Sequence, residues 1–214
     1  MIQPQSTLRL SLLVTLCLAC AGDFFVTLIL APAYPDYSHL RMVMSELGTS
    51  SSPYGIWMNR WWLFQGILFI LSAGLLFKSC RTHGKRSLLI VLCMALFGLG
   101  AGLGSGLFPL DPPGSSVSLS GQLHDTLAAI GFVALAGIPF AGALRFRNEN
   151  HTTRQVISWS AFIGGLGLLV MFIVTEAQPE AMTGLWQRSF LFLEYAYLIW
   201  YGTLISAPEP SCVS

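Results

Sequence analysis

The chain has 214 residues, of which 54% are hydrophobic and only 10% are charged, and its formal net charge is +1. Since soluble globular domains carry about 25% charged residues, this composition excludes an ordinary soluble domain and indicates an integral membrane protein. The basic residues lie in short connections, so no nucleic-acid partner is expected.

Six apolar runs, each close to the roughly 20 residues that cross the hydrocarbon core of a bilayer, predict six transmembrane helices. They are Leu8–Leu30, Trp61–Phe77, Ser87–Leu107, Leu123–Leu144, Val156–Thr175 and Gly184–Ile205. Little chain remains between the runs. We therefore expect an all-α polytopic bundle that forms one integral membrane domain over residues 1–214.

Lys and Arg gather in alternate connections. Seven of them follow the second or the fourth run: Lys78, Arg81, Lys85, Arg86, Arg145, Arg147 and Arg154. Loops rich in Lys and Arg stay on the cytoplasmic side of a membrane. An even number of spans then places the N- and C-termini in the cytoplasm as well.

The connection after the first run, Ala31–Arg60, is the longest. Its segment Tyr34–Leu47 mixes charged and apolar side chains, which favours a short helix at the membrane interface. Gly48–Gly55 is rich in Ser and contains Pro53, so it is expected to form turns.

The third run is rich in glycine. Gly98, Gly102 and Gly106 share one helix face, and Gly100 and Gly104 share another. Small residues at this spacing let helices approach closely in lipid, where packing drives association. The run therefore predicts close packing of this helix against its neighbours.

Polar side chains lie near the same, outward ends of the runs: Asp23, His39, Glu46, Asn59, Asp111, His124, Asp125, Gln187 and Arg188. Because a bilayer makes such groups costly, their gathering suggests a polar site at the extracytoplasmic end. Asp125 has a simpler explanation, since a carboxylate near the N-terminus of the fourth helix complements the helix dipole.

Chemical roles can be assigned to this set. His124 is the candidate general acid or base, with Asp111 and Glu46 as its partners. The candidate ligand-binding residues are Ser45, Asn59, Gln187, Arg188, Asp23 and Glu194. Among them Arg188 suits an anionic head group, and Glu194 lies seven residues after Gln187 on the same helix face.

No cofactor is expected. The chain has four histidines and lacks the H-x-x-x-H spacing of many catalytic zinc sites. The alternative is a mixed zinc site at the outward end, formed by His39, His124, Asp111 and Glu46.

Five short motifs resemble one known pattern: Met44-Ser45-Glu46-Leu47-Gly48, Trp57-Met58-Asn59, Phe108-Pro109-x-Asp111, His124-Asp125 and Gly184-Leu185-x-Gln187-Arg188. The pattern is similar to that of the bacterial and archaeal membrane family catalogued as domain of unknown function 998, DUF998. The resemblance covers nearly the whole chain and implies a six-span bundle in a bacterial or archaeal inner membrane. It implies no reaction.

Two weaker similarities concern parts of the chain. Ser45–Thr49 resembles the stretch after the first helix in Frag1/DRAM-type membrane proteins. A distant similarity to membrane hydrolases of the alkaline-ceramidase type implies that Ser45, Asp111 and His124 stand for some of their zinc-site residues. The C-terminal histidine pair of those enzymes is absent here.

Three functions remain open from the sequence. The first is binding of a membrane lipid or small amphiphile at the polar site, without catalysis. The second is membrane-embedded acid–base chemistry on a lipid, which uses His124 and Asp111. The third is a proton-coupled carrier, in which Asp23 and Glu194 relay protons. The sequence names no protein partner and leaves open whether the chain is an enzyme.

Overall fold

The computed structural model of the chain describes residues 4–79, 84–176, 178 and 181–206. Arg81, assigned above to a basic connection, lies outside these residues. Within the described part, all regular structure is helical: α1 (Pro4–Leu30), η1 (Ala31–Ala33), η2 (Met44–Gly48), α2 (Gly55–Ser79), α3 (Gly84–Phe97), η3 (Gly98–Gly104), α4 (Ser105–Leu107), α5 (Leu119–Asn148), α6 (Thr152–Glu176) and α7 (Thr183–Ser206).

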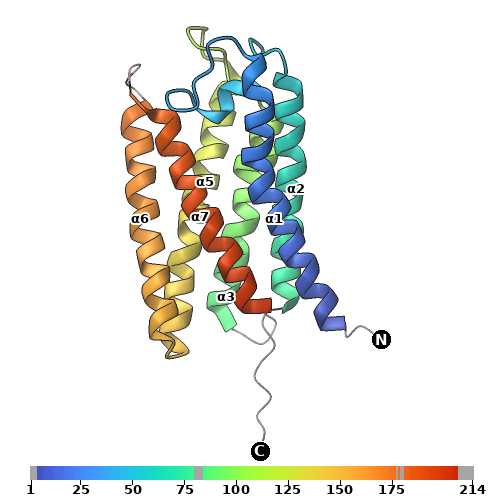
Figure 1. Cartoon of the computed structure of the whole chain (residues 1–214), viewed down its shortest axis with the longest axis vertical. Coiled ribbons are helices and arrows are strands. Elements are labelled where there is room, and N and C mark those ends of the chain that lie inside the picture. Colours follow the sequence, from blue (N-terminus) through green and yellow to red (C-terminus); the bar gives the residue numbers. More distant parts are fainter. Residues whose placement is uncertain (1–3, 80–83, 177, 179–180, 207–214) are drawn as a thin grey trace, which may run out of the picture.

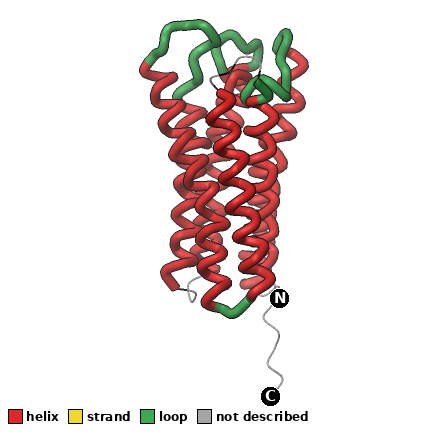
Figure 2. Tube along the Cα trace, turned by 90° about the vertical axis from the view of Figure 1, so that its left-hand side faces the viewer, coloured by secondary structure: helices red, strands yellow, loops and turns green. Residues whose placement is uncertain are grey.

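The long helices stand side by side as a bundle (Figures 1 and 2). Each packs against the next around a closed ring, in the order α1, α2, α3, α5, α6, α7 and back to α1. The connections 31–54 and 108–118 lie at one end of the ring, which we call the loop end. The start of α1 and the end of α7 lie at the opposite end, which we call the terminal end (Figure 1).

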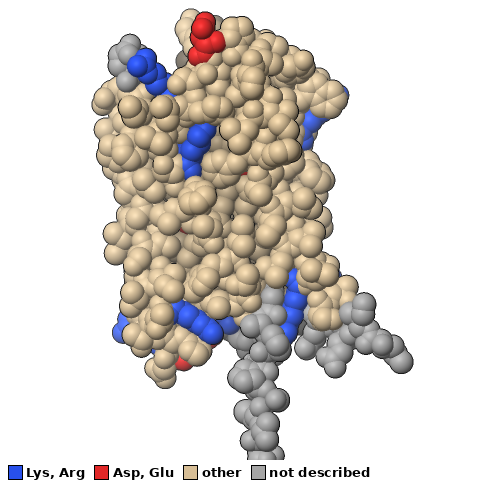
Figure 3. Space-filling model, viewed as in Figure 1, with Lys and Arg blue, Asp and Glu red and all other residues tan. Residues whose placement is uncertain are grey.

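Five stretches of the described chain are long and apolar enough to cross a membrane, judged by length and composition: Ser6–Ala33, Gly55–Ser79, Arg86–Leu107, Leu119–Asn148 and Thr152–Glu176. On the face shown in Figure 3, Lys, Arg, Asp and Glu lie mainly toward the two ends of the bundle. The prediction of an all-α membrane bundle is therefore confirmed.

Helix α7 is not among those five stretches. It carries Gln187, Arg188 and Glu194 together with several Trp and Tyr residues, which lower its hydropathy. It nevertheless packs between α6 and α1 as a full member of the ring. A sixth span and cytoplasmic termini stay predictions.

Several predicted boundaries were wrong at the loop end. Helix α2 begins at Gly55 rather than Trp61, and Tyr34–Leu47 is irregular except for the 3-10 turn that starts at Met44. Helix α5 begins at Leu119, where the Ser118 side chain accepts a hydrogen bond from Gly121 N over 3.1 Å. Asp125 is thus well inside α5 and is not at its N-terminus. Hydropathy marks where lipid begins, whereas turns and caps decide where a helix begins.

The close packing predicted from the glycines is confirmed. An added Cβ would lie 2.8 Å from Gly66 O at Gly98 and 2.7 Å from Asn59 O at Gly106, so this face meets α2. At Gly104 it would lie 2.8 Å from the Leu127 side chain, so the other face meets α5. Across this stretch, η3, the backbone widens into a π-helix, which the sequence did not predict.

Candidate functional site

A cavity of about 480 Å³ lies inside the ring, and residues from every helix of the ring line it. Its polar lining groups include Asp23, Gln65, Ser105, His124, Gln187 and Tyr195. Its apolar walls include Phe97, Phe132, Leu169, Phe172 and Leu191. A concave, mainly apolar space with a few polar groups is the usual form of a small-molecule site.

Asp23 is the centre of a polar network on one side of the cavity. Tyr195 Oη donates a hydrogen bond to Asp23 Oδ2 over 2.9 Å, and Trp61 Nε1 donates to Oδ1 over 3.3 Å. Gln65 Nε2 in turn donates to Tyr195 Oη and to Ala19 O, each over 3.2 Å. Asp23, Gln65 and Tyr195 are buried, so the network ties α1, α2 and α7 together inside the bundle.

The segment Met44–Gly48 closes the cavity at the loop end. Met44 N donates a hydrogen bond to Gln187 Oε1 of α7 over 2.7 Å. Asn59 Nδ2 of α2 donates to Gly48 O over 2.9 Å. The segment is thereby held at both ends, and Met44 and Ser45 line the cavity.

Glu46, in the same segment, does not line the cavity and hydrogen-bonds to the backbone of its own turn. Its Oε1 accepts a hydrogen bond from Val43 N over 3.1 Å, which completes a capping arrangement at the start of the turn. Burial raises the pKa of Glu46, and the Val43 hydrogen bond and the charge of Arg188 oppose this rise.

Arg188 of α7 holds part of the connection 31–54 in place at the loop end. Its Nη1 donates to Met42 O and to Gly184 O over 2.9 and 3.0 Å, and its Nη2 donates to Tyr37 Oη over 2.5 Å. Burial raises the pKa of Tyr37 to about 12. Burial, with the charge of Arg188 as the smaller cause, lowers the pKa of His39. Arg188 is not among the lining residues.

His124 lines the cavity, but its proposed partner does not pair with it. His124 Nδ1 and Phe108 O are 2.8 Å apart, and the Trp62 ring stands edge-on to the imidazole. Asp111 accepts hydrogen bonds from Ser118 N and Ser118 Oγ, each over 2.7 Å, and these lower its pKa. Within the described residues, no hydrogen bond joins Asp111 to His124. Asp111 instead stabilises the turn that leads into α5.

The structure thus divides the predicted site residues into two groups. Asp23, Ser45, His124 and Gln187 line the cavity. The remaining ones are not among its lining residues: Glu46, Asn59, Asp111, Arg188 and Glu194. Glu194 is buried and points toward α6, where its carboxylate lies against Gly165. Neither of its oxygens has a hydrogen-bond partner among the described residues.

Gln65 and Tyr195 were missed by the sequence reasoning. Both have a signal that could have found them. Gln65 is an amide in the middle of an apolar run, and Tyr195 follows Gln187 by eight residues and therefore shares its helix face. Polar side chains along one face of a membrane helix point to the bundle interior.

The exposed residues of the cavity lining all belong to α5 and α6: Asp125, Ala129, Val133, Ile173 and Glu176. In Figure 1 these two helices meet at the terminal end and stand farther apart toward the loop end. The cavity lining therefore reaches the side of the bundle along the loop-end halves of α5 and α6. We call these five residues the mouth.

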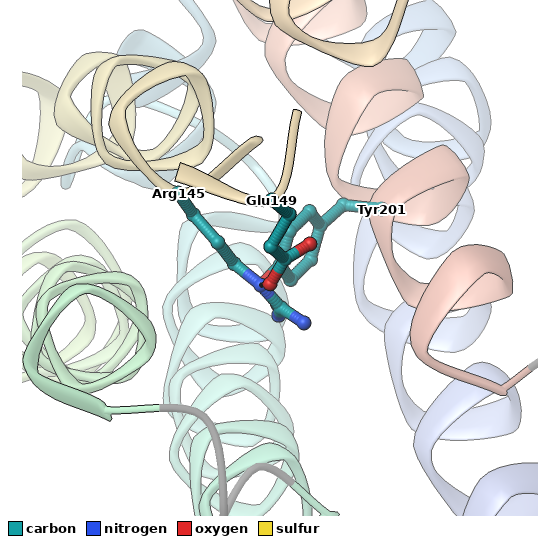
Figure 4. A network of polar contacts seen from close by, with 3 residues as sticks. All are labelled: Arg145, Glu149 and Tyr201. Atoms are coloured by element: carbon teal, nitrogen blue, oxygen red, sulfur yellow. Dashed lines mark hydrogen bonds and ion pairs between the residues drawn. The ribbon is translucent and has the colours of Figure 1, made fainter. Parts of the chain in front are cut away.

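A second polar cluster lies at the terminal end (Figure 4). Arg145 Nε donates to Glu149 Oε1 over 2.8 Å, and Arg145 Nη1 donates to Tyr201 Oη over 2.5 Å. Arg145 was assigned above to a basic connection, but it is a buried residue of α5. It joins α5 to α7 and does not line the cavity.

Across the described residues, no group of three or more His, Cys, Asp or Glu side chains is placed to hold a metal ion. No curated protein and no solved structure matches the chain. A family model described as "Protein of unknown function (DUF998)" matches residues 17–204, which is most of the chain. The chain therefore belongs to the DUF998 family.

Proposed function

We propose that this protein binds a membrane lipid or other single amphiphile in the cavity between its helices. The observation that carries the proposal is the sideways mouth between α5 and α6, which joins a polar-lined cavity to the surface that would face lipid. An amphiphile can enter by this route without leaving the membrane. Its polar part would meet Gln187, His124 and Gln65, and its apolar part would meet Phe132 and Phe172.

The proposal includes six spans, with α7 as the sixth and the loop end outward. Lys78, Arg86, Arg147 and Arg154 lie at the terminal ends of their helices, where the positive-inside rule favours the cytoplasm. Helix α7 packs along α1 and α6. The mouth would then face the outer half of a cell membrane, which we take to be the inner membrane of a bacterium or archaeon.

Blocking the mouth tests the proposal. Ala129 is an exposed residue of the mouth, whereas its neighbour Ile130 is exposed but does not line the cavity. Native mass spectrometry of the protein released from nanodiscs should show a retained amphiphile in the wild type and in Ile130→Trp. The retained mass should be lost in Ala129→Trp. An empty wild-type protein, or equal retention in both variants, would contradict the proposal.

Catalysis on the same amphiphile is the second candidate, and it depends on His124. This imidazole is the one histidine side chain among the described lining residues, and Ser105 and Asp125 line the same cavity. The test is product release: the purified protein should convert a bound lipid, and His124→Ala should bind it without conversion. Binding with no product from the wild type would leave the binding function alone.

A further inference from the structure

We propose that the amphiphile taken up by this cavity carries a positively charged head group, an ammonium or quaternary ammonium nitrogen. This inference rests on the proposed function and names the chemical class of its ligand. The head group would sit at the mouth, between Asp125 of α5 and Glu176 of α6, with the chain against the apolar walls.

The charges of the lining are of one sign. The described residues that line the cavity include Asp23, Asp125 and Glu176 but neither Lys nor Arg. Asp23 is already satisfied by Trp61 and Tyr195. Asp125 and Glu176 are not: among the described residues, no hydrogen bond or ion pair reaches either carboxylate.

Asp125 and Glu176 share one location, the mouth of the cavity. Asp125, Ala129 and Val133 follow one face of α5 at four-residue spacing, and Ile173 and Glu176 face them from α6. Both carboxylates are exposed and line the same cavity from neighbouring helices. Two like charges at the edge of an apolar region repel each other, and a cation between them would relieve that repulsion.

The cation that could have favoured an anionic head group is occupied elsewhere. Arg188 donates to Met42 O, Gly184 O and Tyr37 Oη, and it lies outside the cavity lining. A phosphate or carboxylate in the cavity would therefore face acidic side chains, with no Lys or Arg among the described lining residues to balance its charge. The earlier assignment of Arg188 to an anionic head group is not supported by this geometry.

The remaining polar and aromatic lining suits the same ligand. Gln187 Nε2 and Gln65 Oε1 belong to side chains that are 95% or more buried, and no described residue pairs with either atom. They can bind hydroxyl or amide groups next to the nitrogen. Aromatic rings from Trp62, Phe132 and Phe172 also line the cavity, and ring faces attract ammonium groups.

A series of probes with one chain and three charges tests the inference: dodecylamine as the cation, dodecanol as the neutral probe and dodecanoate as the anion. Binding to the protein in a non-ionic maltoside detergent, which carries no ammonium group, is measured calorimetrically at neutral pH, with protein-free detergent as the reference. We expect dodecylamine to bind at least about tenfold more tightly than dodecanol, a difference of about 1.4 kcal/mol. Dodecanoate should bind more weakly than dodecanol.

Substitutions at the mouth test whether Asp125 and Glu176 cause the preference for dodecylamine. Asp125→Asn with Glu176→Gln should remove the preference for dodecylamine over dodecanol. Each single variant should remove part of this preference. The single variants replace the double variant in the binding test if the double variant does not fold. Asp36→Asn is the matched control, because Asp36 is exposed outside the cavity and Asn also tolerates its positive φ of 59°. It should keep the full preference.

The outcomes separate the two proposals. Equal binding of all three probes, tighter binding of dodecanoate, or an unchanged preference in the double variant would overturn the cationic head group. Amphiphile binding would still stand in those cases. Binding of none of the probes, together with an empty wild-type protein in mass spectrometry, would overturn both.

Discussion

Tyr195 Oη donates a hydrogen bond to Asp23 Oδ2 over 2.9 Å, and this bond joins α7 to α1 inside the membrane bundle. Both residues are buried, at 3% exposure each. The bond closes the ring of helices where α7 meets α1. It therefore belongs to the scaffold that shapes the cavity.

Removing this hydroxyl should destabilise the protein. Tyr195→Phe leaves Asp23 Oδ2 without its donor in a buried place, which costs about 1–3 kcal/mol of unfolding free energy. Unfolding in mixed micelles measures the change. Tyr34→Phe is the control, because its hydroxyl meets Ser51 in an exposed contact, and it should change the free energy by less than about 0.5 kcal/mol. Equal effects of the two variants would mean that the buried bond adds nothing.

The glycine stripe gives a second prediction. An added methyl at Gly98 would lie 2.8 Å from Gly66 O and 2.9 Å from Phe69 Cβ, so α2 and η3 would have to separate. Gly98→Ala should therefore destabilise the protein by about 1–3 kcal/mol.

Gly167 is the matched control for this substitution. It is an exposed glycine of α6 with nothing within 4 Å of an added Cβ. Gly167→Ala should be neutral or stabilise the helix by up to about 1 kcal/mol. The same unfolding assay measures both variants. A stable Gly98→Ala protein would show that the helices are not in close contact there.

The helices and this glycine packing could be predicted from the sequence, because both depend on local patterns. Apolar length sets a span, and residues four apart share a face wherever the helix lies. The cavity could not be predicted in the same way. Its lining combines Asp23, Gln65, His124 and Tyr195, whose proximity depends on the order and rotation of the helices around the ring.

The same limit explains the predicted site residues that lie apart. Asp111 and His124 both lie at the loop end, but both carboxylate oxygens of Asp111 accept hydrogen bonds from Ser118. Glu194 shares a helix face with Gln187, yet it lies deeper and meets Gly165 of α6 rather than the cavity. Residues predicted near the same end of the bundle need not be in contact. Hydrogen bonds within a loop can hold a side chain away from the cavity, and residues on different helices can be separated by the width of the bundle.

Glu46 predicts a pH dependence. Burial raises its folded-state pKa above the ordinary value of 4.5, so its neutral form is the one that suits the fold. The contribution of Glu46 to the stability of the folded state is fully present below its pKa in the unfolded chain. This contribution is lost as the pH rises through its pKa in the folded protein. Glu46→Gln keeps an oxygen for Val43 N but cannot ionise. Its apparent Tm should exceed that of the wild type at about pH 7–8 and equal it near about pH 4.

A second variant separates the charge from the hydrogen bond. Glu46→Ala removes the acceptor for Val43 N and should lower the Tm even near about pH 4, where the charge is absent. Thermal unfolding across the pH series measures all three proteins. A Glu46→Gln protein that is less stable than the wild type at neutral pH would show that the carboxylate is favoured in its ionised form.

Arg188 should anchor the connection at the loop end by geometry as well as by charge. Its guanidinium donates to Met42 O, Gly184 O and Tyr37 Oη at once, which the compact ammonium of lysine cannot reproduce. Arg188→Lys should therefore loosen residues 37–44 and increase their amide hydrogen exchange by about tenfold or more, if about 1.4 kcal/mol of local stability is lost. Arg147→Lys, at an exposed position of α5, should leave this exchange unchanged.

Binding of dodecanol in the cavity should survive in Arg188→Lys if the Met44–Gln187 hydrogen bond still closes the cavity. Unchanged exchange in Arg188→Lys would show that charge alone holds the connection, and tighter binding of dodecanoate in the wild type than in this variant would assign Arg188 to the ligand after all.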